Sequence, residues 1–157
     1  MLLNVAQIVS TFNTPAGTFS VTHDEYYIHR AVFTDTAEQS LTHHPIATLV
    51  ENQLNAYFKN PHYRFQLPLK PNGTLYQLRV WNALLVIPVG RTLTYGELAN
   101  TLQSGPRAIG QACKKNPLAI FIPCHRVVGK TGLGGFMGNP NALHYKEALL
   151  NHEISEC

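Results

Sequence analysis

The sequence predicts an α+β protein, in which a small N-terminal antiparallel β-sheet with one helix is followed by a mainly helical second part. Short β-rich segments separated by turn residues fill the first 33 positions. Apolar residues then fall at helical spacing over residues 45–58, and two capping-box sequences follow residue 73. The 157 residues, 45% of them hydrophobic, are enough for a small domain joined to a modest second one.

Three β-rich segments open the chain. They cover residues 5–12, 17–22 and 26–33, and they are separated by Asn13-Thr14-Pro15 and His23-Asp24-Glu25, which are typical of turns. A small antiparallel sheet is the simplest arrangement of three such segments.

A helix is expected next, over residues 45–58, with its apolar face against the sheet. Asn60-Pro61 ends this helix. Lys70-Pro71-Asn72-Gly73 predicts the boundary between a domain of residues 1–72 and a domain of residues 73–157. The net charge also changes there, from −1 over residues 1–73 to +4 over residues 74–157.

Two capping boxes predict the first helices of the second domain. Thr74 and Gln77 open a helix that should run to about Ile87, where Pro88-Val89-Gly90 stops it. Thr94-Tyr95-Gly96-Glu97 opens a short helix through Leu102.

A turn at Ser104-Gly105 and a helix from Pro106 to about Lys115 complete a helix-turn-helix candidate. Its second helix carries Ala108, Gly110 and Ala112, which let its backbone come close to whatever it docks on. Five basic residues and no acid between residues 105 and 130 suit a phosphate backbone. Tight packing between helices and a solvated charged surface are the alternative explanations.

Ile122-Pro123-Cys124-His125-Arg126-Val127 is the stretch around which the second domain is organised. A short apolar run over residues 118–122, bounded by Pro117 and Pro123, predicts a buried strand or turn that holds Cys124 rigidly. His125 and the positive charge of Arg126 lie next in sequence, and a base or cation lowers the pKa of a thiol. The alternative is a small buried hydrophobic cysteine.

A glycine-rich loop spans residues 130–139 and lacks the Gly-Lys-Ser/Thr ending of a phosphate-binding loop. We expect it to form the mobile wall of a pocket for a flat ligand. Asn139-Pro140 should then open a final helix that extends to Glu153.

Composition argues against three classes of protein: those held by disulfides, those that bind a metal and those that span a membrane. The three cysteines, Cys113, Cys124 and Cys157, form no Cys-x-x-Cys pair, which argues against a disulfide framework and for a reducing compartment. No metal site is expected, because His43-His44 suits the polar start of a helix and no cysteine lies near it. No stretch has transmembrane length, and the start lacks signal-peptide features. We therefore expect a cytoplasmic protein, or a nuclear one in a eukaryote.

Six ordered motifs resemble the O6-alkylguanine-DNA alkyltransferases, DNA repair proteins that move an alkyl group from guanine onto their own cysteine. The motifs are Tyr76-Gln77 with Val80-Trp81, Ile87-Pro88-Val89-Gly90, Thr94-Tyr95-Gly96-Glu97-Leu98-Ala99, Arg107-Ala108-Ile109-Gly110, Lys115-Asn116-Pro117 and Pro123-Cys124-His125-Arg126-Val127. Lys146-Glu147 and Leu149-Leu150-Asn151-His152-Glu153 close the match. The resemblance implies a ribonuclease-H-like first domain and a second domain that binds DNA.

The resemblance also implies catalytic roles. Cys124 would accept the alkyl group, and His125 would act as a general base through a water, oriented by Glu153. Tyr95 and Lys146 would donate to O6 of the departing guanine. Transfer to a thiol leaves a thioether, so each molecule would react once, without a cofactor.

The resemblance further implies a monomeric protein whose partner is double-stranded DNA that contains O6-alkylguanine, and it leaves O4-alkylthymine open as a second substrate. Arg107 would replace the flipped-out nucleotide in the base stack, and small residues would let the helix enter the minor groove. Ala108, Gly96, Ser104, Asn116 and Lys130 would complete the DNA-binding surface, with Phe136, Gly134 and Gly135 lining the base pocket. Phe136 stands where many family members have tyrosine, and residues 137–145 are a few residues longer than usual.

Three other functions compete with this one. The family has alkyltransferase-like relatives that bind damaged DNA without the cysteine, but Cys124 is present here. A helix-turn-helix regulator would leave Cys124 and Glu153 without a purpose. A cysteine hydrolase would need an oxyanion hole, which amides of the glycine-rich loop could supply.

Overall fold

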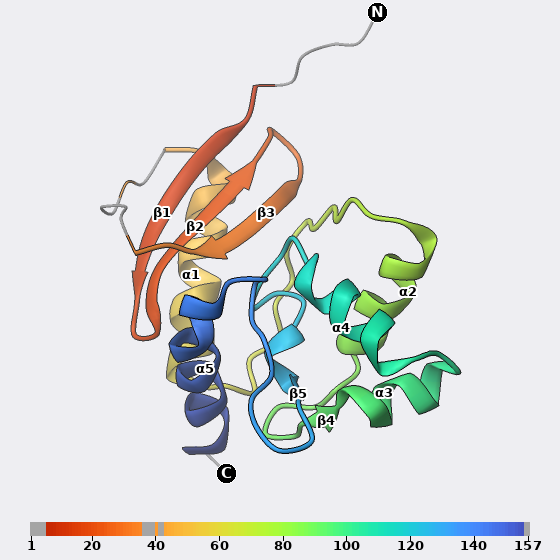
Figure 1. Ribbon diagram of the computed structural model, residues 1–157. Coiled ribbons are helices and arrows are strands. Elements are labelled where there is room, and N and C mark those ends of the chain that lie inside the picture. The colour runs from red at the N-terminus through yellow and green to blue at the C-terminus, as the bar shows by residue number, and fades with distance from the viewer. Residues whose placement is uncertain (1–5, 36–39, 41–42, 156–157) are drawn as a thin grey trace, which may run out of the picture.

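The computed structural model describes residues 6–35, 40 and 43–155. Strands β1 (Ile8–Thr14), β2 (Gly17–His23) and β3 (Ile28–Phe33) form an antiparallel sheet in the order β1-β2-β3. The predicted sheet is confirmed, although Val5, its expected first residue, lies outside the described residues, as does Cys157. Figure 1 shows α1 against one face of the sheet, with α2, α3 and α4 gathered on the other side of the molecule.

Helix α1 (Pro45–Lys59) closely matches its predicted range. The imidazole of His44 caps it by accepting a hydrogen bond of 3.1 Å from the Ile46 amide, which satisfies a donor that the first turn leaves free. Val50, Leu54 and Tyr57 on its inner face are at most 2% exposed. The side chain of Tyr57 therefore points into the molecule from the last turn of α1.

The outer edge of β3 connects the sheet to the second half of the chain. At one end, Ile28 and Leu69 form a bridge, and at the other Ala31 pairs with Leu118. The Ala31 amide donates to Pro117 O over 2.8 Å, and Ala31 O accepts from the Ala119 amide over 3.0 Å. The segment that leads to Cys124 is thus fastened to the sheet, which covers an edge that would otherwise be unpaired.

The second half contains α2 (Leu75–Leu84), β4 (Leu93–Thr94), α3 (Tyr95–Leu102), α4 (Pro106–Lys114), β5 (Val127–Val128) and α5 (Leu143–Ser155). Both predicted capping boxes are present, at Thr74 with Gln77 and at Thr94 with Glu97. The short parallel pair β4-β5 joins the start of α3 to the chain that follows Cys124.

Two predicted helix boundaries are wrong. Helix α2 ends at Leu84 rather than Ile87, because the amides of Val86 and Ile87 turn to carbonyls three residues back, at Ala83 and Leu84. The final helix does not begin at Pro140, where a 3₁₀ turn (Pro140–Ala142) comes first, but at Leu143.

One hydrophobic core runs through both halves of the chain. It includes Phe12, Phe19 and Val50 from the first half and Trp81, Leu118 and Leu149 from the second. Phe121 lies at the junction, with ring centroids 5.7 Å from Phe19 and 5.0 Å from Phe65. Among the described residues, no helix is long and apolar enough to cross a membrane.

Candidate active site

Cys124 is the first residue of a short 3₁₀ turn (Cys124–Arg126) that follows Pro123. The preceding residues 118–122 form a compact turn rather than a strand, with Ile120 at a φ of 69°. Asn116 clamps this turn, since its side-chain amide donates to Ile122 O over 2.8 Å and its carbonyl oxygen accepts from the Leu118 amide over 3.0 Å. Asn116, which the resemblance assigns to the DNA-binding surface, thus braces the rigid loop that holds Cys124.

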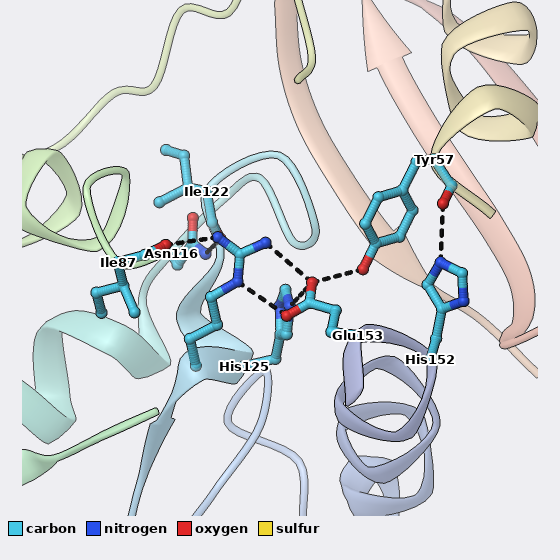
Figure 2. Close-up of polar contacts among 8 residues, drawn as sticks. Tyr57, Ile87, Asn116, Ile122, His125, His152 and Glu153 are labelled. Carbon is cyan, nitrogen blue, oxygen red and sulfur yellow. Dashed lines mark hydrogen bonds and ion pairs between the residues drawn. The ribbon is translucent and has the colours of Figure 1, made fainter. Parts of the chain in front are cut away.

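Glu153 of α5 lies at the centre of a buried hydrogen-bond network (Figure 2). Its Oε2 accepts from His125 Nε2 over 2.8 Å, from Arg126 Nη2 over 2.9 Å and from the Tyr57 hydroxyl over 2.7 Å. Its Oε1 accepts from Arg126 Nε over 2.9 Å. Burial alone would raise the pKa of Glu153, but the hydrogen bonds from His125 and Arg126 and the charge of Arg126 hold it well below its ordinary value. The carboxylate is therefore ionised at neutral pH.

His125 is arranged as a neutral base. A carboxylate only accepts hydrogen bonds, so Nε2 carries the proton that is donated to Glu153, and in the neutral ring Nδ1 keeps its lone pair. Nδ1 is buried without a hydrogen-bond partner among the described residues. Burial lowers the pKa of His125, and the hydrogen bond to Glu153 only partly opposes this effect. The ring is ready to accept a proton at Nδ1.

The positive charge that acts on Cys124 comes from Lys146, not from Arg126 as its place in the sequence suggested. Arg126 is engaged by Glu153 and donates from Nη1 to Ile87 O over 2.7 Å. Burial raises the pKa of Cys124, whereas a hydrogen bond with Asn116 and the charge of Lys146 oppose the rise. The planar guanidinium of Arg126 matches the geometry of the Glu153 carboxylate, so Arg126 pairs with Glu153 rather than with Cys124.

Lys146 is fully buried on α5. Its Nζ donates to Val127 O over 2.6 Å and to Gly135 O over 2.9 Å. Burial lowers its pKa to about 8, despite the opposing influence of Cys124 and Cys113. Lys146 therefore connects the strand after the active-site turn to the glycine-rich loop.

A cavity of about 480 Å³ opens beside Cys124. Tyr95, Gly134, Gly135 and Phe136, all predicted, contribute to its wall. The full lining is Tyr95, Gly110, Cys113, Lys114, Cys124, Gly134, Gly135, Phe136, Met137, Gly138, Asn139, Pro140 and Leu143. Its size suits a flat heterocycle with a substituent.

The glycine-rich loop approaches Tyr95 closely. Gly134 has a φ of +75°, and a Cβ built there would lie 2.7 Å from the Tyr95 hydroxyl oxygen. Burial raises the pKa of Tyr95, partly offset by a hydrogen bond with the Gly135 backbone. The phenol thus stays protonated and can donate into the cavity.

Four of the residues predicted to bind DNA lie on α3, on α4 or in the turn between them: Gly96, Ser104, Arg107 and Ala108. Gln103, in the left-handed conformation with a φ of 53°, ends α3 before the turn to α4. Gly96, Arg107, Ala108 and Lys130 are exposed. Ser104 is half-buried, with its hydroxyl 2.7 Å from that of Tyr76. Gly110 lies one turn after Arg107 and lines the cavity, so the exposed face of α4 borders the mouth beside Cys124.

Sequence reasoning missed two residues of this site. Tyr57 bonds to a carboxylate 96 positions away, and no local pattern indicates such a contact. Cys113 shares the cavity with Cys124, and its position on the helix with Gly110 was the available signal.

Comparison with known proteins places the chain in a family. Residues 8–71 match the ribonuclease-like domain of 6-O-methylguanine DNA methyltransferase, and residues 75–155 match the DNA binding domain of the same family. The chain belongs to the 6-O-methylguanine DNA methyltransferase family. The resemblance recognised in the six motifs is thereby confirmed.

Relatives of this methyltransferase family align over nearly the whole chain. The methylated-DNA–protein-cysteine methyltransferase of Mycobacterium tuberculosis is 40% identical over 155 residues, covering 94% of this chain and 92% of the relative. The constitutive enzyme of Bacillus subtilis is 38% identical, with 92% and 93% covered, and that of Sulfolobus acidocaldarius 34%, with 93% and 92% covered.

Solved structures of the family share the fold. The crystal structure of the Mycobacterium tuberculosis O6-methylguanine methyltransferase superimposes with a TM-score of 0.82 at 32% identity, covering 97% of this chain and 95% of that one. The same organism's protein in complex with DNA gives a TM-score of 0.78 at 37% identity, with 95% and 94% covered.

Proposed function

We propose that this protein repairs DNA by moving the alkyl group of O6-alkylguanine onto the sulfur of its own Cys124. The observation that carries the proposal is a thiol beside a base-sized cavity, backed by a neutral imidazole that an ionised Glu153 orients. Membership of the methyltransferase family and a relative solved in complex with DNA support duplex DNA as the partner.

The transfer would be a single displacement. The Cys124 proton passes through a water to Nδ1 of His125, and the thiolate attacks the alkyl carbon as the carbon–O6 bond breaks. Tyr95 donates to the guanine so that no full anion departs. The product is a thioether that water does not cleave, so one molecule accepts one group.

Lys146 supports this step through charge and position. Its ammonium opposes the effect of burial on the Cys124 thiol, and its bond to Gly135 O holds the loop that faces Tyr95. Direct donation from Lys146 to the guanine, which the resemblance implies, stays a prediction.

The base reaches the cavity only if it leaves the helix, because its O6 lies within the base pair. Exposed Arg107, at the start of α4, is the side chain proposed to fill the gap in the stack, while Ala108 and Gly110 allow α4 to approach closely. A monomer contains all of these groups, and DNA as substrate implies a cytoplasmic location in a cell without a nucleus.

An intact and peptide mass spectrum tests the proposal after incubation with a duplex that carries one O6-methylguanine. One added methyl group on the Cys124 peptide, saturating at one per molecule, is expected, with Cys124→Ser as the blank. DNA binding without methyl uptake would favour a non-catalytic damage sensor. Turnover of an ester without DNA binding would favour a hydrolase.

A further inference from the structure

Tyr57 connects the first half of the chain to the candidate catalytic groups. It lies in the last turn of α1, yet its hydroxyl donates to Glu153 Oε2 over 2.7 Å, the same oxygen that accepts from His125. Tyr57 and Glu153 are both 1% exposed. Figure 2 shows the phenol and the imidazole approaching the carboxylate from different elements.

We propose that Tyr57 is a positioning residue for alkyl transfer, which holds Glu153 in the orientation that His125 needs and makes the reaction depend on the docking of α1. This inference rests on the proposed function. Tyr57 is not among the residues that line the cavity, and its hydroxyl bonds to Glu153, so its action passes through Glu153.

The surroundings of Tyr57 fix the hydroxyl in place. His152, the neighbour of Glu153 on α5, donates from Nε2 to the Tyr57 backbone carbonyl over 2.8 Å. The Tyr57 ring centroid lies 5.0 Å from those of Phe58 and His152 and 5.3 Å from that of Phe65. The end of α1 is therefore attached to α5 at two successive residues, and the phenol has little freedom to turn elsewhere.

The hydroxyl also moderates the charge that His125 experiences. Burial first, and then the charge and hydrogen bond of Glu153, raise the pKa of Tyr57, so the phenol remains a donor. The Tyr57 hydroxyl and the imidazole both donate to Oε2 and share its negative charge. Without the phenol, Oε2 attracts a protonated imidazole more strongly, which raises the pKa of His125. The other charges that act on His125 come from Arg126 and Lys146, and both oppose its protonation.

Tyr57→Phe tests the role because it removes only the hydroxyl. Tyr63→Phe is the matched control, since the Tyr63 ring also packs on Phe65, at 5.9 Å. Single-turnover methyl transfer from an O6-methylguanine duplex is measured for both variants from pH 5 to 9. For Tyr57→Phe we expect a rate about tenfold lower at neutral pH and an acid limb moved up by about one pH unit, with DNA affinity unchanged.

The sign of the shift follows from the base role. Protonated His125 cannot accept the thiol proton, so the rate is lost as pH falls through its pKa, and a higher pKa moves that loss to higher pH. If the substitution only unfolded part of the protein, fewer molecules would take up a methyl group, and the final uptake would fall. The rate constant of the molecules that do react would stay the same. Should Tyr57→Phe fail to fold, His152→Phe takes its place, because it removes the hydrogen bond to the Tyr57 carbonyl that holds α1 against α5. A lower rate and a raised acid limb are expected for it too, and a profile equal to that of Tyr63→Phe would overturn the inference.

A rate constant and acid limb equal to those of Tyr63→Phe would overturn the inference. Failure of the proposed function has a different signature, because the unmodified protein would then take up no methyl group. Uptake by the unmodified protein, with a slower and shifted profile in Tyr57→Phe, supports both.

Discussion

At the scale of single residues, the site separates two thiols that share one cavity. Both Cys113 and Cys124 line it, but only Cys124 is next in sequence to His125 and hydrogen-bonded to Asn116. Burial and the neighbouring Cys124 raise the pKa of Cys113 to about 12, so it is a thiol at any physiological pH. A thiol without a base is a poor nucleophile.

We therefore predict that Cys113→Ser takes up one methyl group from O6-methylguanine DNA at a rate within about threefold of the unmodified protein. Serine is close in size, and the proton path from Cys124 to His125 is untouched. Peptide mass spectrometry locates the methyl group. Label on the Cys113 peptide, or loss of uptake in Cys113→Ser, would contradict the assignment of Cys124 as acceptor.

Glu153 should also determine how stability depends on pH. Its folded pKa lies below the ordinary value of 4.5, so the unfolded chain binds more protons in acid. The stability that Glu153 contributes is present above about pH 4.5 and is lost as pH falls toward the folded pKa. Arg126 would be left poorly paired by Glu153→Gln, at a cost of about 3–5 kcal/mol at pH 7.

Urea unfolding at pH 7 and pH 4 checks this prediction. The unmodified protein should lose more unfolding free energy between the two values than Glu153→Gln, which has no carboxyl to titrate at that position. Alkylation should slow in the variant, while DNA affinity measured below its unfolding range stays the same. Equal pH dependence in the two proteins would show that other carboxyl groups dominate.

The sequence predicted Cys124, His125 and Glu153 together only through the resemblance to a family. Residue chemistry alone indicated a cysteine beside a base and a cation, and it assigned Arg126 the charge that Lys146 supplies. Tyr57 could not be found, because a contact between α1 and α5 depends on how two halves of the chain pack.

At the scale of elements, the helices that begin with a capping box were the most predictable. Thr74 and Thr94 each pair with a glutamine or glutamate three residues on, and both helices begin where expected. Residues 118–122 stayed ambiguous between strand and turn, since only the pairing of Leu118 with Ala31 and the clamp by Asn116 decide their path.

Helix α4 leads to a prediction that separates base flipping from chemistry. Arg107→Ala should slow repair of O6-methylguanine in duplex DNA by about tenfold or more, because nothing replaces the extruded base. Reaction with free O6-benzylguanine, which needs no flipping, should change by less than about twofold. Both rates are followed by loss of the free thiol of Cys124, with Lys59→Ala on α1 as a control for loss of one exposed basic residue. Equal losses on the two substrates would remove Arg107 from the flipping role.

At the scale of the whole molecule, the two predicted domains share one core. The Lys70-Pro71-Asn72-Gly73 boundary separates two segments that match different family domains, yet Phe121 packs on Phe19 and Phe65, and Ala31 pairs with the segment before Cys124. Composition and charge predicted the boundary at residues 70–73. They carry no information about how tightly the segments before and after this boundary pack against each other.

We predict that both halves unfold in one cooperative transition. Trp81, the single tryptophan, is 2% exposed in the second half and donates to Ala112 O over 2.8 Å, so its fluorescence reports on α2 and α4. Amide exchange of β2 reports on the sheet in the first half. Because the shared core and the β3 edge connect them, both probes should give the same urea midpoint and slope.

Disrupting the edge provides the sharper test of this coupling. Ala31→Pro removes the amide that donates to Pro117 O and should lower both midpoints together, while slowing methyl transfer because the segment before Cys124 loses its support. The control is Asn100→Ala, on the exposed side of α3. A second proline in the sheet, such as Thr18→Pro, would not serve, because it would disturb the turn between β1 and β2. If the sheet melts first while Trp81 fluorescence and methyl transfer stay unchanged, the two halves are independent. The packing of α1 against α5 then contributes nothing to the reaction.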